Sequence, residues 1–351
     1  MKITAKKKVL LIATGGTIAS KSTPNGLTPL ITSEEIISYV PEIQEYCQID
    51  TLQLFNIDST NIYYTHWLAM AQCVEAHYNQ YDAFVITHGT DTMAYTAAAL
   101  SYLIQNNRKP VVITGSQKSL AAQESDARQN LSDAFIYASY DGACGVHILF
   151  DHKILLGTRS RKTRTKSFNA FQSIDFPEIG IIRNHKVIPY VTDVIHEEAP
   201  TFYHNLNPNI FVLRLIPGIS PDILQYIGEH YDAVVIESFG VGGLPSYGNT
   251  RFEEAIHDFL ARGKTIIMST QVPHEGSDMA VYQVGYYMKE RYDLIEAYSM
   301  TTEAIVTKLM WILGQTKEPD EIRRLFYQPI MHDIIQNSYM FEKFIKLFSV
   351  L

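Results

Sequence analysis

The stretch Lys8-Val-Leu-Leu-Ile-Ala-Thr-Gly-Gly16 carries the strongest structural signal in this chain. Five consecutive apolar residues, Val9 to Ala13, are typical of a buried strand and are too few for the core of a signal peptide. A second apolar run ends in a similar way, at Thr87-His-Gly-Thr-Asp-Thr92. In an open parallel sheet, ligands bind beyond the carboxyl ends of the strands. We therefore expect the two threonine loops to converge on one small molecule.

Strand and helix patterns alternate along the rest of the chain. The apolar runs predict strands at Lys8–Ala13, Ala83–Thr87, Pro110–Thr114, Gly145–Phe150, Asn209–Ile216, Asp232–Glu237 and Lys264–Ser269. Helical patterns lie at Ser33–Val40, Tyr64–Asn79, Asp91–Ile104 and Ala127–Ser139. Continuous apolar strands that alternate with helices indicate a parallel sheet covered on both faces, so the fold class is α/β.

The chain is long enough for two domains with separate cores, at 351 residues and 46% hydrophobic. The segment Tyr81-Asp-Ala-Phe-Val-Ile is echoed by Tyr231-Asp-Ala-Val-Val-Ile, and each is followed by a second apolar run about one strand-helix-strand unit later. Any two such units look alike, yet two successive doubly wound α/β domains are the economical interpretation. We expect domains at 1–190 and 209–351, joined by a linker at 191–208 that is polar and contains two prolines.

Composition excludes several classes of partner. A net charge of −8 argues against a surface that binds nucleic acid, which would need clustered lysines and arginines. The three cysteines are widely spaced and suit reduced thiols in a cytoplasmic protein. No apolar stretch is long enough to span a bilayer. The histidines are scattered, with no His-Glu-x-x-His or Cys-x-x-Cys pattern, so we expect neither a metal nor another cofactor.

Each threonine loop has a plain structural alternative. The glycine pair after Thr14 could cradle a dinucleotide phosphate, but the Gly-x-Gly-x-x-Gly spacing and its third glycine are missing. Thr90 or Asp91 could simply be the N-cap of the helix that follows. Gly89 is not needed for a cap, and it favours a functional loop. His88, beside this motif, is expected to be a packed structural imidazole.

A threonine hydroxyl is a poor nucleophile at neutral pH, so a threonine hydrolase needs a base and a group that holds that base in place. A lysine beside a carboxylate can serve. Lys162 is the candidate, although it lies in a basic run whose ordinary interpretation is a solvated strand. Spacing alone does not distinguish Lys162 from Lys166.

Taken together, these motifs resemble the bacterial L-asparaginases, particularly the cytoplasmic type I branch. The resemblance rests on Thr14-Gly-Gly-Thr-Ile-Ala19, Asp58-Ser-Thr-Asn61, His88-Gly-Thr-Asp-Thr-Met93, Val112-Ile-Thr-Gly-Ser-Gln117 and Gly157–Lys162, and it continues through Glu237-Ser-Phe-Gly240 to Thr302–Leu309. It implies a larger N-terminal flavodoxin-like domain and a smaller C-terminal Rossmann-like domain. It also implies hydrolysis of L-asparagine to L-aspartate and ammonia with no cofactor.

The resemblance further implies a role for each matched residue. Thr14 matches the nucleophile, and a second group that activates water or shares in proton transfer consists of Thr90, Asp91 and Lys162. Residues expected to bind substrate are Ser59 for the α-carboxylate, Asp91 for the α-ammonium, and the neighbouring Thr60 and Gly89. The resemblance also implies a homotetramer, a dimer of dimers in which a neighbour completes each active site.

The sequence departs from the family pattern at three positions. Leu27 stands where the mobile first loop usually has a tyrosine near the nucleophile, which leaves that proton-relay role unassigned. Glu237 and Val272 stand where some type I relatives have an arginine and a cysteine of an allosteric asparagine site. Because a carboxylate cannot replace a guanidinium that pairs with an anion, we expect this effector site to be missing or changed.

Two other functions stay open, and a third, that of an amidotransferase subunit, is disfavoured. A glutaminase-asparaginase of broader specificity fits the same motifs, because one methylene in a pocket changes binding by only about 1–3 kcal/mol. An amidotransferase subunit acting on misacylated tRNA is expected to have an extra N-terminal module and a basic surface. A non-catalytic amino-acid sensor on this fold is expected to lose a hydroxyl or the lysine, whereas this chain keeps all four catalytic candidates.

Overall fold

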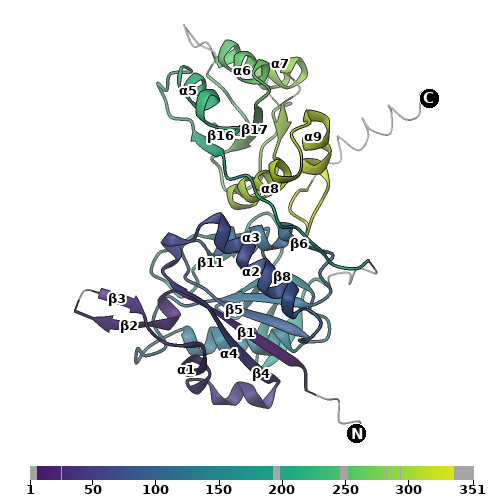
Figure 1. The fold of residues 1–351 in the computed structure, drawn as a ribbon. Coiled ribbons are helices and arrows are strands. Elements are labelled where there is room, and N and C mark those ends of the chain that lie inside the picture. The colour runs from purple at the N-terminus through teal and green to yellow at the C-terminus, as the bar shows by residue number, and fades with distance from the viewer. Residues whose placement is uncertain are drawn as a thin grey trace. The chain divides into compact units, whose positions relative to one another are not determined.

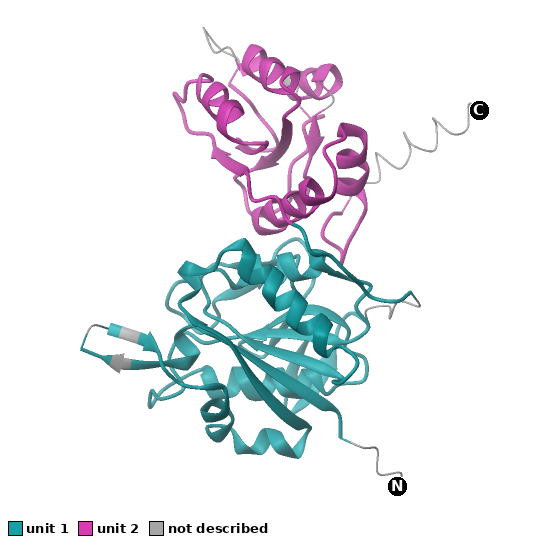
Figure 2. Ribbon diagram, viewed as in Figure 1, with its two compact units in different colours: residues 1–205 teal, residues 206–351 magenta. Residues whose placement is uncertain are grey.

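The computed structural model describes residues 6–24, 26–192, 198–245, 252–281, 283–292 and 294–335. The chain divides into two compact units, residues 1–205 and 206–351 (Figure 2). Among the described residues, no helix is long and apolar enough to cross a membrane.

The main sheet of unit 1 has eight strands (Figure 1). In spatial order they are β13 (Lys186–Pro189), β12 (Gly180–Arg183), β9 (Lys153–Leu156), β8 (Gly145–Phe150), β7 (Pro110–Thr114), β5 (Ala83–Thr87), β1 (Lys8–Gly15) and β4 (Gln48–Ile57). The strands from β8 to β4 pair in parallel. Numbered along the chain, these parallel strands lie in the order 2-1-3-4-5, the order of flavodoxin-like sheets. The expected flavodoxin-like fold is therefore confirmed.

Helices cover both faces of this sheet. Figure 1 shows α2 (Tyr64–His77) and α3 (Met93–Leu103) on one face, and α1 (Ser33–Ser38) and α4 (Ala127–Ala138) on the other. Every residue of β5, β7 and β8 is buried, as expected for strands covered on both sides. The apolar runs predicted these strands correctly because nearly complete burial leaves no polar alternation.

Strand β4 was not predicted, and its position explains why. It lies at the edge of the sheet, pairs with β1 alone among the strands of that sheet, and is partly exposed along its length. Its sequence, Gln48-Ile-Asp-Thr-Leu-Gln-Leu-Phe-Asn-Ile57, accordingly mixes polar and apolar residues, and the apolar-run criterion passes over it.

Smaller elements of unit 1 lie in the connections between these strands and helices. They are the hairpin of β2 (Ser20–Thr23) and β3 (Gly26–Pro29), the short helices η1 (Thr17–Ala19), η2 (Pro41–Glu45) and η3 (Ser59–Asn61), the antiparallel pair β10 (Ser160–Lys162) and β11 (Phe171–Ser173), and the pair β6 (Ile104–Gln105) and β14 (Thr201–Phe202). Leu27 belongs to β3, and its side chain lies outside the described part of the structure.

Unit 2 is built on a four-stranded parallel sheet whose spatial order follows the chain: β15 (Ile210–Arg214), β16 (Ala233–Ser238), β17 (Thr265–Thr270) and β18 (Ile295–Glu296). Its helices are α5 (Ile223–His230), α6 (Phe252–Ala261), α7 (Gln283–Tyr292), α8 (Thr302–Gln315) and α9 (Pro319–Tyr327). Leu224, Phe252 and Phe259 from the helices pack on Val234 and Ile236 of the sheet. The apolar runs of the sequence predicted three of these strands, β15, β16 and β17.

Candidate active site

The candidate site lies where the strand order of the main sheet reverses. β1 and β5 are neighbours, with Ala13 in register with Thr87, and the chain leaves β1 for β4 on one side before returning to β5 on the other. In open α/β sheets, ligands bind beside the loops that follow the strands at such a point. The two threonine loops follow β1 and β5, as the sequence predicted.

Thr14 lies at the end of β1 and is almost fully buried. Its hydroxyl donates a hydrogen bond of 2.7 Å to the carbonyl oxygen of Thr87, in the adjacent strand. Gly15 and Gly16 follow with φ of +102° and +78°, a region that L side chains rarely adopt. A Cβ on Gly16 would lie 2.3 Å from the backbone nitrogen of Gly89. The loop after Thr14 therefore touches the loop at Gly89 directly, and a glycine at position 16 is required for that contact.

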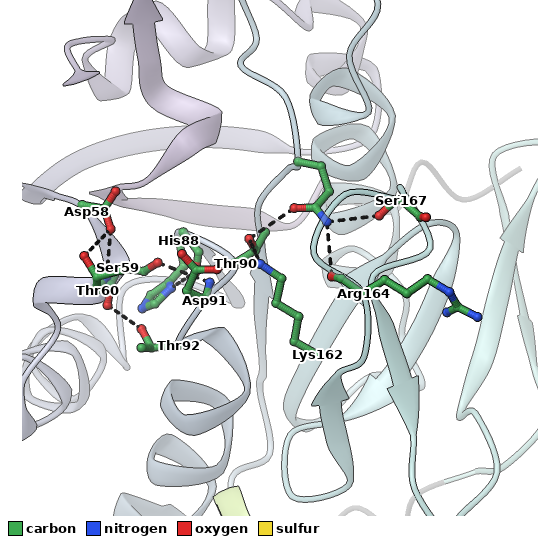
Figure 3. A network of polar contacts seen from close by, with 12 residues as sticks. Asp58, Ser59, Thr60, His88, Thr90, Asp91, Thr92, Lys162, Arg164 and Ser167 are labelled. Carbon is green, nitrogen blue, oxygen red and sulfur yellow. Dashed lines mark hydrogen bonds and ion pairs between the residues drawn. The ribbon is translucent and has the colours of Figure 1, made fainter. Parts of the chain in front are cut away.

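A third loop, after β4, contacts the second threonine loop through Ser59 (Figure 3). The buried Ser59 hydroxyl accepts a hydrogen bond of 3.3 Å from the backbone N–H of Asp91, and its carbonyl accepts one of 2.8 Å from the Thr92 hydroxyl. A Cβ on Gly89 would lie 2.6 Å from the Ser59 Oγ. The Thr60 hydroxyl instead donates to Asp58 at 2.7 Å, within its own turn.

Lys162 reaches the second loop from β10. Its Nζ donates at 2.7 Å to the hydroxyl of Thr90 and at 2.7 Å to Oδ1 of Asp91. The Lys162 side chain is 16% exposed, whereas that of Asp91 is 57% exposed. Lys166 is exposed in the connection between β10 and β11. The structure thus brings Lys162, and not Lys166, to Thr90 and Asp91. Sequence spacing did not distinguish these two lysines.

Neither Thr90 nor Asp91 is the N-cap of α3. The helix begins at Met93, and Thr92 occupies the N-cap position without a side-chain hydrogen bond to the helix. The alternative raised by the sequence, that this pair serves only to cap the helix, is therefore wrong. Both side chains point to Lys162 instead (Figure 3).

His88 is buried inside the fold, away from solvent. Its Nδ1 lies 2.6 Å from the carbonyl of Gly89, and since a carbonyl can only accept, Nδ1 carries the proton. Its Nε2 then accepts from the Thr96 hydroxyl at 3.0 Å, and Trp67 donates to the same hydroxyl at 3.0 Å. Burial lowers the pKa of His88 to about 4. A neutral imidazole in this network acts as the structural support that the sequence predicted.

Gln117 ends the motif Val112-Ile-Thr-Gly-Ser-Gln117, and the sequence predicted no function for its side chain. Its Oε1 accepts from the Thr90 hydroxyl at 3.4 Å, and its Nε2 donates to the carbonyl of Ser167 at 3.1 Å. Nothing in the local pattern around Gln117 signals these contacts, because both partners are distant in sequence.

Glu237 and Val272 belong to unit 2. The largely buried Glu237 carboxylate accepts from the Thr302 hydroxyl at 2.6 Å, and its second oxygen lies 3.7 Å from Arg214. Val272 is 47% exposed. Among the described residues, no group of His, Cys, Asp and Glu side chains is arranged to hold a metal ion.

Two family models match the chain. One, described as "Asparaginase, N-terminal", matches residues 8–194, and the other, "Glutaminase/Asparaginase C-terminal domain", matches residues 209–326. An L-asparaginase of Thermococcus kodakarensis is 38% identical, over 93% of this chain and 99% of its own. L-asparaginase 1 of Escherichia coli K12 is 32% identical, over 94% and 98%. A subunit of the glutamyl-tRNA(Gln) amidotransferase of Metallosphaera sedula is 32% identical, over 91% of this chain and 74% of its own.

Solved structures give the same result. The thermostable L-asparaginase of Thermococcus kodakarensis superposes with a TM-score of 0.89 at 37% identity, covering 94% of this chain and all (100%) of that one. A probable cytoplasmic L-asparaginase of Campylobacter jejuni superposes with a TM-score of 0.78 at 26% identity, covering 92% and 99%.

Proposed function

The chain belongs to the asparaginase family, and on that premise we propose that it is an L-asparagine amidohydrolase, which releases L-aspartate and ammonia. One observation carries this proposal. Lys162 contacts both Thr90 and Asp91, and the loop that holds these two residues packs against the loop that follows Thr14. A threonine hydroxyl in contact with a lysine, which is paired with a carboxylate, can move protons, and acyl transfer through a threonine nucleophile requires such a group. A non-catalytic sensor would be free to lose any of the four catalytic candidates. This chain keeps all of them, which supports a catalytic function.

Thr14 is the proposed nucleophile. Its oxygen attacks the side-chain carboxamide carbon, the carbon–nitrogen bond breaks, and the nitrogen leaves as ammonia with the proton that Thr14 gave up. Water then adds to the resulting β-aspartyl ester, which frees aspartate and returns a proton to Thr14. In the free protein the Thr14 hydroxyl donates to a carbonyl, which cannot take its proton, so proton transfer needs another group. We assign that transfer, and the activation of water, to Thr90, Lys162 and Asp91.

Substrate binding is assigned to the loops around Ser59. The Ser59 hydroxyl accepts from the Asp91 N–H, so its own proton is free to be donated to the α-carboxylate. The exposed Asp91 carboxylate, already paired with Lys162, is the partner of the α-ammonium. Gly89 and Thr60 complete this surface. Backbone N–H groups of the two threonine loops stabilise the oxyanion of the tetrahedral intermediate.

We further propose a cytoplasmic homotetramer of the type I branch, in which residues 1–190 carry the nucleophile, 191–208 form the linker, and 209–351 form the second domain. Support comes from the likeness to L-asparaginase 1 of E. coli and to the probable cytoplasmic enzyme of C. jejuni. Light scattering of the purified chain measures the assembly directly, and a monomer at working concentration would contradict it.

Ammonia release from L-asparagine and L-glutamine, measured in parallel, tests the function. We expect asparagine to be hydrolysed and Thr14→Ala, Thr90→Val and Lys162→Met to lose at least about a hundredfold in kcat/KM. Near-native turnover by Thr14→Ala would remove the nucleophile assignment. Equal use of glutamine would widen the function to a glutaminase-asparaginase. Binding of asparagine without ammonia release would favour the sensor.

A further inference from the structure

We propose that Gln117 is a positioning residue, which sets the direction of the Thr90 hydroxyl and joins it to the hairpin that carries Lys162. The inference rests on the proposed function, because it concerns the chemical step of the same site. It adds a residue outside the catalytic and substrate-binding sets already assigned.

The hydrogen bonds of Thr90 show why its direction depends on Gln117. A hydroxyl has one proton to donate and two lone pairs that accept. Lys162 donates to the Thr90 oxygen at 2.7 Å and occupies one lone pair. The proton of Thr90 then points to Oε1 of Gln117, 3.4 Å away. One lone pair remains, and it can accept a hydrogen bond from a water molecule and so orient that water toward the ester. The proton of the water passes to the Thr14 oxygen as the ester bond breaks.

The orientation of the Gln117 amide follows from its other contacts. Its Nε2 lies 3.1 Å from the carbonyl oxygen of Ser167 and 3.5 Å from that of Arg164. Carbonyl oxygens accept only, so the amide nitrogen must face them and the amide oxygen must face Thr90. Dashed lines in Figure 3 follow this path from Thr90 to Arg164 and Ser167.

These two carbonyls belong to the connection between β10, which ends at Lys162, and β11. The connection is closed by backbone bonds from Thr163 and Arg164 to the carbonyl of Ala170. The Lys118 ammonium also lies over the Phe168 ring, 5.6 Å from its centre. Thr90, Lys162, the hairpin connection and Gln117 therefore form a closed ring of contacts, in which Gln117 bonds to Thr90 on one side and to the connection that follows Lys162 on the other.

The backbone of Gln117 is itself held by Asp126, a largely buried carboxylate. Asp126 accepts from the N–H of Gln117 at 2.9 Å and from that of Lys118 at 3.0 Å. The side chain of Asn130 donates to Asp126 at 3.2 Å and to the carbonyl of Gly115 at 3.0 Å. Asp126 directly precedes α4 yet makes no side-chain capping bond to that helix. Its carboxylate instead fixes the turn from which Gln117 extends.

The proposal predicts an effect on turnover without an effect on binding. Gln117 contacts Thr90 and the hairpin connection, whereas Ser59 and Asp91 carry substrate recognition. We expect Gln117→Met, which keeps the length but loses every hydrogen bond, to lower kcat about five- to tenfold with KM unchanged within about twofold. Gln105→Met is the matched control, since Gln105 is also partly buried and also donates to a backbone carbonyl, that of Tyr102.

A second variant separates the contact with Thr90 from the contacts with the hairpin connection. Gln117→Glu keeps an oxygen that accepts from Thr90 but loses the donor to the Ser167 and Arg164 carbonyls. We expect kcat to fall in the order wild type, Gln117→Glu, Gln117→Met, at equal melting temperatures. A glutamate variant no better than the methionine variant would overturn the assignment to the Thr90 hydroxyl.

The decisive experiment measures kcat and KM for L-asparagine together with the melting temperature, for wild type and these three variants. Gln117→Met with kcat within about twofold of wild type, or with a raised KM and normal kcat, overturns the inference while leaving the proposed function intact. A loss matched by Gln105→Met also overturns it. A wild-type chain that releases ammonia from neither asparagine nor glutamine removes the proposed function, and the inference with it.

Discussion

Lys162 donates a hydrogen bond of 2.7 Å to Thr90, although 72 positions separate the two residues in the chain. This contact predicts that Lys162→Met lowers kcat/KM at least about a hundredfold, since the proton-transfer group loses its ammonium. Because Asp91 is exposed, and a methionine keeps the apolar contacts of the lysine stem, the free energy of unfolding should change by less than about 1 kcal/mol. Lys166→Met is the control in steady-state assays of ammonia release. Equal losses of kcat/KM in both variants would show that only the total charge of the basic run is important, and not the contact of Lys162 with Thr90.

Ser59 and Thr60 are adjacent and both carry hydroxyls, but only the first is buried against the second threonine loop. We expect Ser59→Ala to raise KM for asparagine by about tenfold or more, because a hydrogen bond to a charged carboxylate is lost. Thr60→Val should change KM by no more than about threefold, since the Thr60 hydroxyl donates to Asp58. Initial rates over a range of asparagine concentrations check both values. The reverse order of KM would reassign carboxylate binding to Thr60.

Glu237 places a carboxylate, bonded to Thr302 and close to Arg214, at the position where the expected allosteric pattern has an arginine. An anionic effector would meet a like charge there, so we expect the rate to depend hyperbolically on asparagine concentration. The measurement is a rate curve that covers substrate concentrations from far below KM to far above it. A sigmoidal curve that becomes hyperbolic in Glu237→Gln would contradict this expectation.

Gly16 holds the two threonine loops in contact, and Gly26 offers a matched comparison. Both have positive φ, +78° and +106°, but a Cβ on Gly26 meets nothing within 4 Å. Gly26→Ala should therefore cost only the backbone strain, about 1 kcal/mol. Gly16→Ala adds a clash with the Gly89 backbone, so we expect several kcal/mol and loss of most activity. Chemical denaturation and ammonia assays compare the pair, and similar effects would show that loop contact is unimportant.

His88 makes the stability of unit 1 depend on pH. Its pKa falls from the ordinary 6.5 to about 4 on folding, because burial disfavours the charged ring. Between pH 6.5 and about pH 4, His88 binds a proton in the unfolded chain but not in the folded one. The contribution of His88 to the free energy of unfolding is therefore fully present above about pH 6.5, and roughly 3 kcal/mol is lost as the pH falls toward 4. Urea unfolding followed by Trp67 fluorescence, in a Trp311→Phe background, measures the slope of the free energy of unfolding against pH. The slope should decrease in His88→Gln, and an unchanged slope would assign the acid sensitivity to other groups.

Local patterns predicted much of the fold. Strands β5, β7 and β8 were found because full burial makes them continuous apolar runs, and Thr14 and Thr90 were placed at strand ends because glycines interrupt those runs. The start of α3 was less certain, since Thr90 and Asp91 are ordinary residues for a helix start. The structure begins the helix at Met93 and directs both side chains to Lys162.

By itself, the sequence determined that the chain forms parallel α/β units with hydroxyl-bearing loops at strand ends, because burial imposes periodicity on neighbouring residues. Tertiary structure alone decided that Lys162 rather than Lys166 meets Thr90, that β4 completes the sheet edge, and that Gln117 lies between Thr90 and the hairpin connection. These contacts join residues far apart in the chain. They depend on the strand order and on the path of the β10–β11 hairpin, and neither can be predicted from the periodicity of neighbouring residues.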